Sequence, residues 1–300
     1  MFPSTLSTIS TIFTSTNVIH AHQHSFRVAK LEILAEDTNA RLGEATGFFC
    51  EYEKQTFLVT NWHVVAGRHF QTRLPLHPSQ ALPGSLKVHT HISKTISPFT
   101  APSSSTAFNI SLLDRDGGPS WVEHPLFGCD VDVIVIGVEE LIPDCTKIYR
   151  IDLAAELARD THLAVMDQAF VTGYPLSATT TPNSLPIYKS GTIASEPRVF
   201  DSQPRIYIDG KTKTGMSGSP VMVKRRSDLQ QHGHASTLST DTLDFVGIYS
   251  GRDRQERSEF EAELGIMWPY KECLIPILEA FFSAQSESDR NDSRCSHTSS

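Results

Sequence analysis

The stretch Gly215-Met216-Ser217-Gly218-Ser219-Pro220 is the most informative part of this chain of 300 residues. It places a serine between two glycines and shortly before a proline, a pattern typical of a tight loop that presents a nucleophile. A serine hydroxyl attacks poorly on its own, so it needs a histidine base and a carboxylate that orients the histidine. We therefore take Ser217 as a candidate nucleophile that requires two partners elsewhere in the chain.

A candidate base lies where an apolar run ends. The run from Phe57 to Val65 has the pattern of a strand, contains His63 close to its end, and breaks at Gly67. Most of the other histidines lie in loop-like or tail contexts, where a solvated or structurally bonded imidazole is the ordinary interpretation. The position of His63 at a strand exit makes it the candidate base.

A candidate carboxylate heads the apolar run from Val131 to Val138. An acid next to a buried strand is costly unless it has a partner. Asp132 abuts the apolar run directly, whereas Asp130 still reaches water at its entry, so we prefer Asp132. The alternative is that Asp132 only caps a strand end.

These residues occur in the order His, Asp, Ser, and with two further motifs they give the chain a family resemblance. It resembles the chymotrypsin-fold, trypsin-like serine peptidases, in particular bacterial trypsin-like peptidase domains akin to the HtrA proteases without their peptide-binding PDZ extension. The similarity covers about residues 45 to 270 and is carried by Thr60-Asn61-Trp62-His63-Val64-Val65, Val131-Asp132-Val133, Gly173-Tyr174-Pro175, the Ser217 hexapeptide and Val246-Gly247-Ile248-Tyr249-Ser250-Gly251.

The resemblance implies a serine endopeptidase with two six-stranded antiparallel β-barrels and the active site in the cleft between them. It assigns the catalytic roles to His63, Asp132 and Ser217, and the oxyanion hole to the N–H groups of Gly215 and Ser217. An ordinary tight turn is the alternative for the glycines. Met216 stands where trypsin has an aspartate that pairs with a newly cut N-terminus, so we expect activity without such cleavage.

The resemblance also implies a set of substrate-binding positions. Ser250 belongs to the strand that pairs with the substrate backbone, or else to a simple strand-ending turn. Lys211 and Arg252 would favour an acidic side chain before the cut bond, unless both point into water. The full set comprises Lys211, Thr212, Ser250, Gly251, Arg252 and Gly265.

Short apolar or alternating runs separated by Pro, Gly and Ser predict an all-β protein, although this pattern does not choose between a sandwich, one barrel and a barrel pair. Helix-like spacing of apolar residues predicts a helix over Tyr270 to Phe282, with Pro276 tolerated in its first turn. The two longest loops are expected at Ser93–Ala107 and Ser227–Asp241. We expect a disordered tail over 1–25, a first half over 26–150, a second half with the helix over 151–285, and a disordered tail over 286–300.

Composition restricts the partners. The net charge is -8 with no basic stripe, which argues against nucleic acid. No apolar run approaches the ~18 residues of a membrane span, and the start lacks the pattern of a secretory signal. Five widely spaced cysteines without a paired motif predict free thiols and, with the missing signal, a soluble cytoplasmic protein that uses no metal or cofactor. Its partner would be a peptide or protein substrate, and nothing indicates an oligomeric state.

Two alternatives stay open. The chain is either an enzyme or a catalytically silent relative that binds peptides in the same cleft. A second hypothesis takes His20, His22 and His24 as a metal-binding arm, against the ordinary interpretation of a polar tail.

Overall fold

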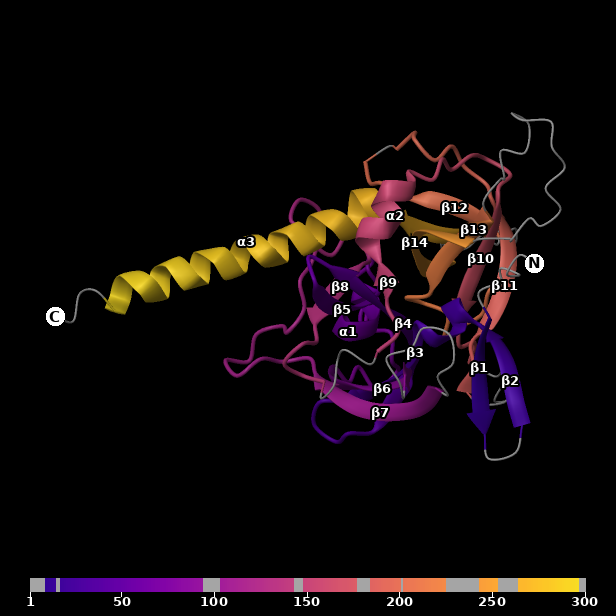
Figure 1. The fold of residues 1–300 in the computed structure, drawn as a ribbon. Helices are drawn as coiled ribbons and strands as arrows, with labels where there is room; N and C mark the ends of the chain where they lie inside the picture. The colour runs from indigo at the N-terminus through magenta and orange to yellow at the C-terminus, as the bar shows by residue number, and fades with distance from the viewer. Residues whose placement is uncertain are drawn as a thin grey trace, which may run out of the picture.

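The computed structural model describes most of the chain as two β halves joined side by side, with a long helix leading away from them (Figure 1). The structure describes residues 9–14, 17–93, 103–142, 148–176, 184–200, 202–224, 243–252 and 264–296. Within these ranges, only the backbone is described for residues 9–14, 17–21, 93, 103–104, 252 and 287–296.

The first half is a seven-stranded sheet. Its main path runs β7-β6-β3-β4-β5-β8, with β9 added parallel to β4. The other pairs are antiparallel, and apolar side chains of β4 and β5 are buried, as expected for strands that pack on a core. The strands are β3 (Val28–Ala35), β4 (Arg41–Tyr52), β5 (Gln55–Thr60), β6 (Pro83–Ser93), β7 (Ser103–Ser111), β8 (Ile134–Gly137) and β9 (Ile151–Asp152).

The second half is a closed antiparallel barrel. Its six strands follow the order β10-β11-β12-β15-β14-β13, and closure removes the free edges that an open sheet would leave. The strands are β10 (Gln168–Gly173), β11 (Ile187–Ile193), β12 (Ile206–Asp209), β13 (Pro220–Lys224), β14 (Leu243–Arg252) and β15 (Leu264–Pro269).

One hydrophobic core crosses the boundary between the halves. It joins Phe48 of β4 to Phe245 of β14, whose rings meet edge to face at 5.2 Å between centroids, and it includes Trp268 of β15. A smaller core fills the barrel around Val221, Tyr249 and Met267. Because apolar packing is continuous across the boundary, the two halves hold a fixed relative position.

The C-terminal helix covers a sheet edge. α3 (Tyr270–Ser296) packs Phe281 against Gly137 of β8, where a larger residue would be crowded. Pro276 lies in the second turn of α3, not the first, and has no N–H to give the Glu272 carbonyl. His124 Nε2 donates to that carbonyl instead, at 3.2 Å. A side chain from the first half therefore replaces the helix hydrogen bond that proline removes.

The N-terminal segment is ordered further upstream than we predicted. β1 (Ile9–Thr14) and β2 (Asn17–His22) form a hairpin, and the 3-10 helix η1 (Gln23–Phe26) follows. Phe26 is fully buried against His91 of β6, and Ser25 Oγ lies 3.0 Å from the Tyr188 hydroxyl of β11. η1 thus contacts both halves, so the predicted tail over 1–25 is wrong for the part after residue 8 that the structure describes.

Two residues of the proposed metal-binding arm, His22 and His24, make hydrogen bonds within the protein. His24 is buried, and its Nδ1 accepts a hydrogen bond from the Arg27 guanidinium at 3.1 Å. His22 Nδ1 accepts from the His24 backbone N–H at 3.3 Å. Both nitrogens are engaged by protein donors, whereas the side chain of His20 lies outside the described residues.

The all-β fold with a C-terminal helix is confirmed. The two halves differ in whether their sheets close. The second half is a closed barrel, as predicted, whereas the sheet of the first half is open and has β7 and β8 as its two edges. α3 also continues to Ser296, beyond the predicted helix end and into the predicted tail over 286–300. β7 overlaps the predicted Ser93–Ala107 loop. The prediction missed this strand because its Ser-rich sequence lacks an apolar pattern, and the strand is held by its pairing along β6. The predicted 227–241 loop lies outside the described residues.

The buried His24 predicts a loss of stability in acid. Burial, with the positive charge of Arg27, lowers the pKa of His24 from 6.5 to about 3. Between these values the unfolded chain binds a proton that the folded chain does not, so the free energy of unfolding falls as pH falls. From pH 6.5 to 5, His24 alone contributes a loss of about 2 kcal/mol, to be measured by urea unfolding.

The His24→Gln variant should show a shallower dependence on pH, though not a flat one, because burial also lowers the pKa of His91 and His124. His162→Gln is the matched control, since His162 is exposed and also faces an arginine, Arg198, at 2.8 Å. An equal slope in wild type and His24→Gln would contradict the assignment.

Candidate active site

His63 is presented by a single helical turn. β5 ends at Thr60, Asn61 begins α1 (Trp62–Ala66) with an extended backbone, and Gly67 ends it at φ 65°. A residue at that positive φ is most often glycine, because a Cβ is strained there. His63 is therefore fixed between a strand end and a helix cap, with its ring at the wall of a cavity of about 650 Å³.

Asp132 is fully buried and faces His63. Its carboxylate accepts hydrogen bonds from His63 Nδ1 at 2.6 Å, from the His63 backbone N–H at 2.8 Å, and from the Ser250 hydroxyl. Three donors offset the cost of burying this charge. The Asn61 side chain also donates to the Asp132 carbonyl at 2.6 Å. Asp130 lies outward and pairs with Arg73, so the structure places Asp132 rather than Asp130 at the histidine.

The Ser217 loop is anchored at several points to the rest of the protein. Met216 is buried in the barrel core, and Thr46 of β4 receives the loop from the opposite half. The Thr46 hydroxyl donates to the Gly215 carbonyl at 2.8 Å, and its N–H donates to the Ser217 carbonyl at 2.9 Å. Gly215 has φ 95°, a left-handed conformation that favours glycine.

Two backbone donors of this loop are available to a ligand. Among the described residues, neither the Gly215 N–H nor the Ser217 N–H has a hydrogen-bond partner, and both residues line the cavity. Backbone N–H groups in folded proteins are ordinarily paired. Two N–H groups without a partner at residues that line a cavity are a candidate site for an oxygen that carries negative charge.

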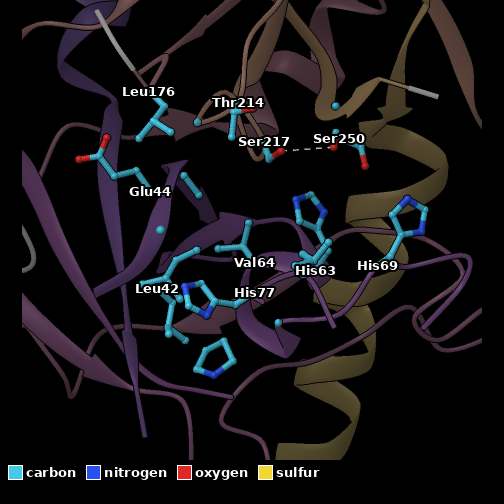
Figure 2. A pocket seen from close by; sticks show the side chains of 18 of the residues that line it. Leu42, Glu44, His63, Val64, His69, His77, Leu176, Thr214, Ser217 and Ser250 are labelled. Atoms are coloured by element: carbon cyan, nitrogen blue, oxygen red, sulfur yellow. Dashed lines mark hydrogen bonds between the residues drawn. The ribbon is translucent and has the colours of Figure 1, made fainter. Parts of the chain in front are cut away.

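The Ser217 hydroxyl lies in the same cavity as His63, and Figure 2 shows the two side chains facing the same space. Within the described residues, its hydrogen bond goes to the Ser250 carbonyl at 3.4 Å and none joins it to His63. Bonds of this length are weak. The histidine and carboxylate are thus joined, whereas the serine points to a neighbouring carbonyl.

The predicted substrate-binding residues are not all in one place. Ser250 and Gly251 line the cavity beside Ser217, and Thr212 reaches it from the loop. The exposed Lys211 does not line this cavity, and the side chain of Arg252 lies outside the described residues. Gly265 lies instead against the ring of Tyr249 inside the barrel.

Sequence reasoning missed Thr46 and the positioning role of Asn61. Both are fully buried polar residues near apolar strands. A buried polar group needs a hydrogen-bond partner, so a threonine or asparagine within an apolar pattern is the available signal. That signal does not name the partner, which for Thr46 lies 169 residues away.

The sequence also matches a known protein family. The model of the trypsin-like peptidase domain matches residues 45–227, more than half of the chain, and the chain belongs to this family. No curated protein sequence matches it. None of the helices in the described ranges has the length and apolar character needed to cross a membrane.

Solved structures also match, at low similarity. The crystal structure of the Rv3671c protease from M. tuberculosis in its active form is 16% identical with a TM-score of 0.41, over 83% of this chain and 78% of that chain. The crystal structure of Deg5 is 16% identical with a TM-score of 0.44, over 83% of this chain and 86% of that chain.

The anchoring role of Thr46 predicts the effect of its removal. Thr46→Val keeps the shape but deletes the hydroxyl that binds Gly215 and that accepts from the Tyr174 N–H at 3.0 Å. We expect a loss of about 1–3 kcal/mol in the free energy of unfolding. The rate at which a fluorophosphonate modifies Ser217 should fall about ten- to a hundredfold, because the loop loses its position.

Thr56→Val is the matched control. Thr56 is also buried in β5, and its hydroxyl accepts from Arg150 at 3.3 Å at the end of the strand away from His63. It should lose stability without losing the labelling rate. Equal labelling rates for the two variants would show that Thr46 does not position the loop.

Proposed function

We propose that this protein is a serine endopeptidase that cleaves peptide bonds of peptide or protein substrates through His63, Asp132 and Ser217. One observation carries the proposal. The buried Asp132 carboxylate lies 2.6 Å from His63 Nδ1, and His63 lines the same cavity as Ser217 and Gly215, whose backbone N–H groups have no partner among the described residues. A packed core alone does not require this combination of a buried pair and open donors.

The first half of the reaction forms an acyl-enzyme. Ser217 Oγ attacks the peptide carbonyl carbon while its proton passes to His63 Nε2, and the carbonyl π electrons move to oxygen. The Gly215 and Ser217 N–H groups bind that oxyanion. The oxyanion then re-forms the C=O bond, the C–N bond breaks, and His63 gives its proton to the leaving amine.

The second half releases the product and restores the enzyme. A water molecule gives one proton to His63 Nε2 and its oxygen attacks the acyl carbon. Collapse of this intermediate breaks the bond to Ser217 Oγ, which takes the proton back from His63. The products are a carboxylic acid and the free serine, so no cofactor enters the balance.

Asp132 fixes the tautomer of His63 for both stages of the reaction. Because its carboxylate accepts from Nδ1, that nitrogen carries the proton and Nε2 presents its lone pair. The Ser250 hydroxyl and the His63 backbone N–H hold the carboxylate in place. For the reaction, the Ser217 hydroxyl must leave the Ser250 carbonyl, to which its bond of 3.4 Å is weak.

We also propose that the nucleophile loop needs no activating cleavage. The residue before Ser217 is Met216, which is fully buried in the barrel core. Apolar packing there takes the place of an ion pair with a new N-terminus. The hydrogen bonds of Thr46 also hold the nucleophile loop in place, from the other half of the protein.

A second candidate is a silent peptide-binding relative. It is favoured by the missing hydrogen bond between Ser217 and His63 within the described residues. Hydrogen bonds between catalytic groups are often long before substrate binds, so this geometry does not decide between the two.

Labelling with a fluorophosphonate probe tests the proposal. By intact mass, wild type should gain one adduct, and Ser217→Ala should gain none. Asp132→Asn should react about 10⁴-fold more slowly, because the amide favours the wrong imidazole tautomer. The control is Ser219→Ala, which removes a buried hydroxyl from the same loop that has no partner among the described residues. A folded wild type without an adduct would favour the silent relative.

A further inference from the structure

Tyr249 lies against Thr212 and Gly265, two of the residues that we expected to line the pocket for the side chain before the cut bond. Tyr249 is 1% exposed, and its hydroxyl is hydrogen-bonded to Thr212. Gly265 leaves space for its ring, because a Cβ at Gly265 would lie 2.8 Å from the Tyr249 oxygen. Neither Tyr249 nor Gly265 lines the cavity at Ser217. Within the described residues, the cavity therefore reaches Thr212 on the barrel side and does not continue between Thr212 and Gly265.

Tyr249 cannot move aside at low cost. Its ring packs in the barrel core with Met267 and Val221, and its backbone bonds both ways to the Ser217 loop. The Tyr249 N–H donates to the Ser219 carbonyl at 2.9 Å, and its carbonyl accepts from the Gly218 N–H at 2.8 Å. Displacing the ring would open a void in a close-packed core.

The cavity extends in another direction, across His63 and into the first half. Leu42, Val64, Leu76, Pro83 and Leu176 are apolar residues of its wall, which also includes Glu44 and His77. Leu76 and Leu176 are 50% and 43% exposed at the rim, unusual values for leucines in one concave surface. Figure 2 shows Leu42, Val64 and Leu176 on one side of Ser217 and His63, with Ser250 on the other.

The direction of a bound peptide follows from the strand next to Ser217. β14 pairs with β13 up to Ile248, so the backbone of Ser250 and Gly251 has no strand partner on that side in the described residues. An extended peptide can add to this free edge. With its acyl part along Ser250 and Gly251 and its carbonyl at the Gly215 N–H, the part after the cut bond crosses His63 toward the leucines.

We propose that this cleft selects substrates after the cut bond: a large apolar side chain in the first two leaving-group residues enters the leucine wall, while Tyr249 restricts the residue before the bond to a small one. The proposal rests on the proposed peptidase function. It assigns specificity to Tyr249, Leu76 and Leu176, none of which touches the reacting atoms.

The test is a peptide library in which the residues on both sides of the cut vary, with products identified by mass spectrometry. Rates are expressed per fluorophosphonate-titrated site. Wild type should cut after Gly, Ala or Ser and before a segment with Leu, Phe or Met. The double variant Leu76→Ser, Leu176→Ser should lower kcat/KM for these apolar substrates by at least about tenfold, relative to substrates with Ser in the same positions. Leu126→Ser is the control, since Leu126 is 78% exposed and does not line the cavity.

Variants at Tyr249 test the second part of the proposal, the restriction to a small residue before the cut bond. Tyr249→Ala should admit Leu or Phe before the bond, whereas Tyr249→Phe keeps the ring and should keep the small-residue preference. If Tyr249→Ala does not fold, the wild-type profile still decides. Two results would overturn this inference and leave the proposed function intact. In both, labelling is normal, and the enzyme either prefers large residues before the cut or shows no apolar preference after it. Absence of both labelling and cleavage overturns the proposed function instead.

Discussion

The hydrogen bonds of Thr46 are the constraint on which the candidate site depends. Its side chain and backbone bind the Ser217 loop, and its carbonyl accepts from the Thr60 hydroxyl at 2.9 Å, three residues before His63. One strand of the first half therefore meets both the nucleophile loop and the strand that leads to the histidine. A small error in this contact would displace Ser217 relative to His63.

This contact explains why glycines occupy two of the surrounding positions. A Cβ on Gly218 would overlap the Thr46 carbonyl oxygen, and one on Gly173 would overlap the hydroxyl groups of Ser219 and Thr46. Backbones can approach this closely only where no side chain intervenes. The glycines of these motifs therefore serve the junction between the halves as well as the loop conformation.

Sequence context singles out some of the candidate residues. His63 stands at a strand exit, Asp132 heads an apolar run, and Ser217 lies in a glycine-rich loop. The structure places His63 and Ser217 at one cavity and buries Asp132 beside His63, where it is hydrogen-bonded to Nδ1. Thr46 and Tyr249 carry no such local signature, because their roles follow from which strands meet. The sequence pattern also missed β7, whose stability comes from its pairing with β6 rather than from its own apolar residues.

The bulge in β14 links the positioning of Asp132 to the shape of the pocket. The register between β14 and β15 shifts between Tyr249 and Gly251, which inserts one extra residue and re-aims the side chains. Tyr249 then turns into the barrel core while Ser250 donates to Asp132. Gly251, at φ 116°, completes the irregular backbone beside Ser217. Because adjacent residues fill the pocket and hold the carboxylate, a change that opens the pocket by moving this strand would also disturb Asp132. A change confined to the Tyr249 side chain would leave the backbone of the bulge in place.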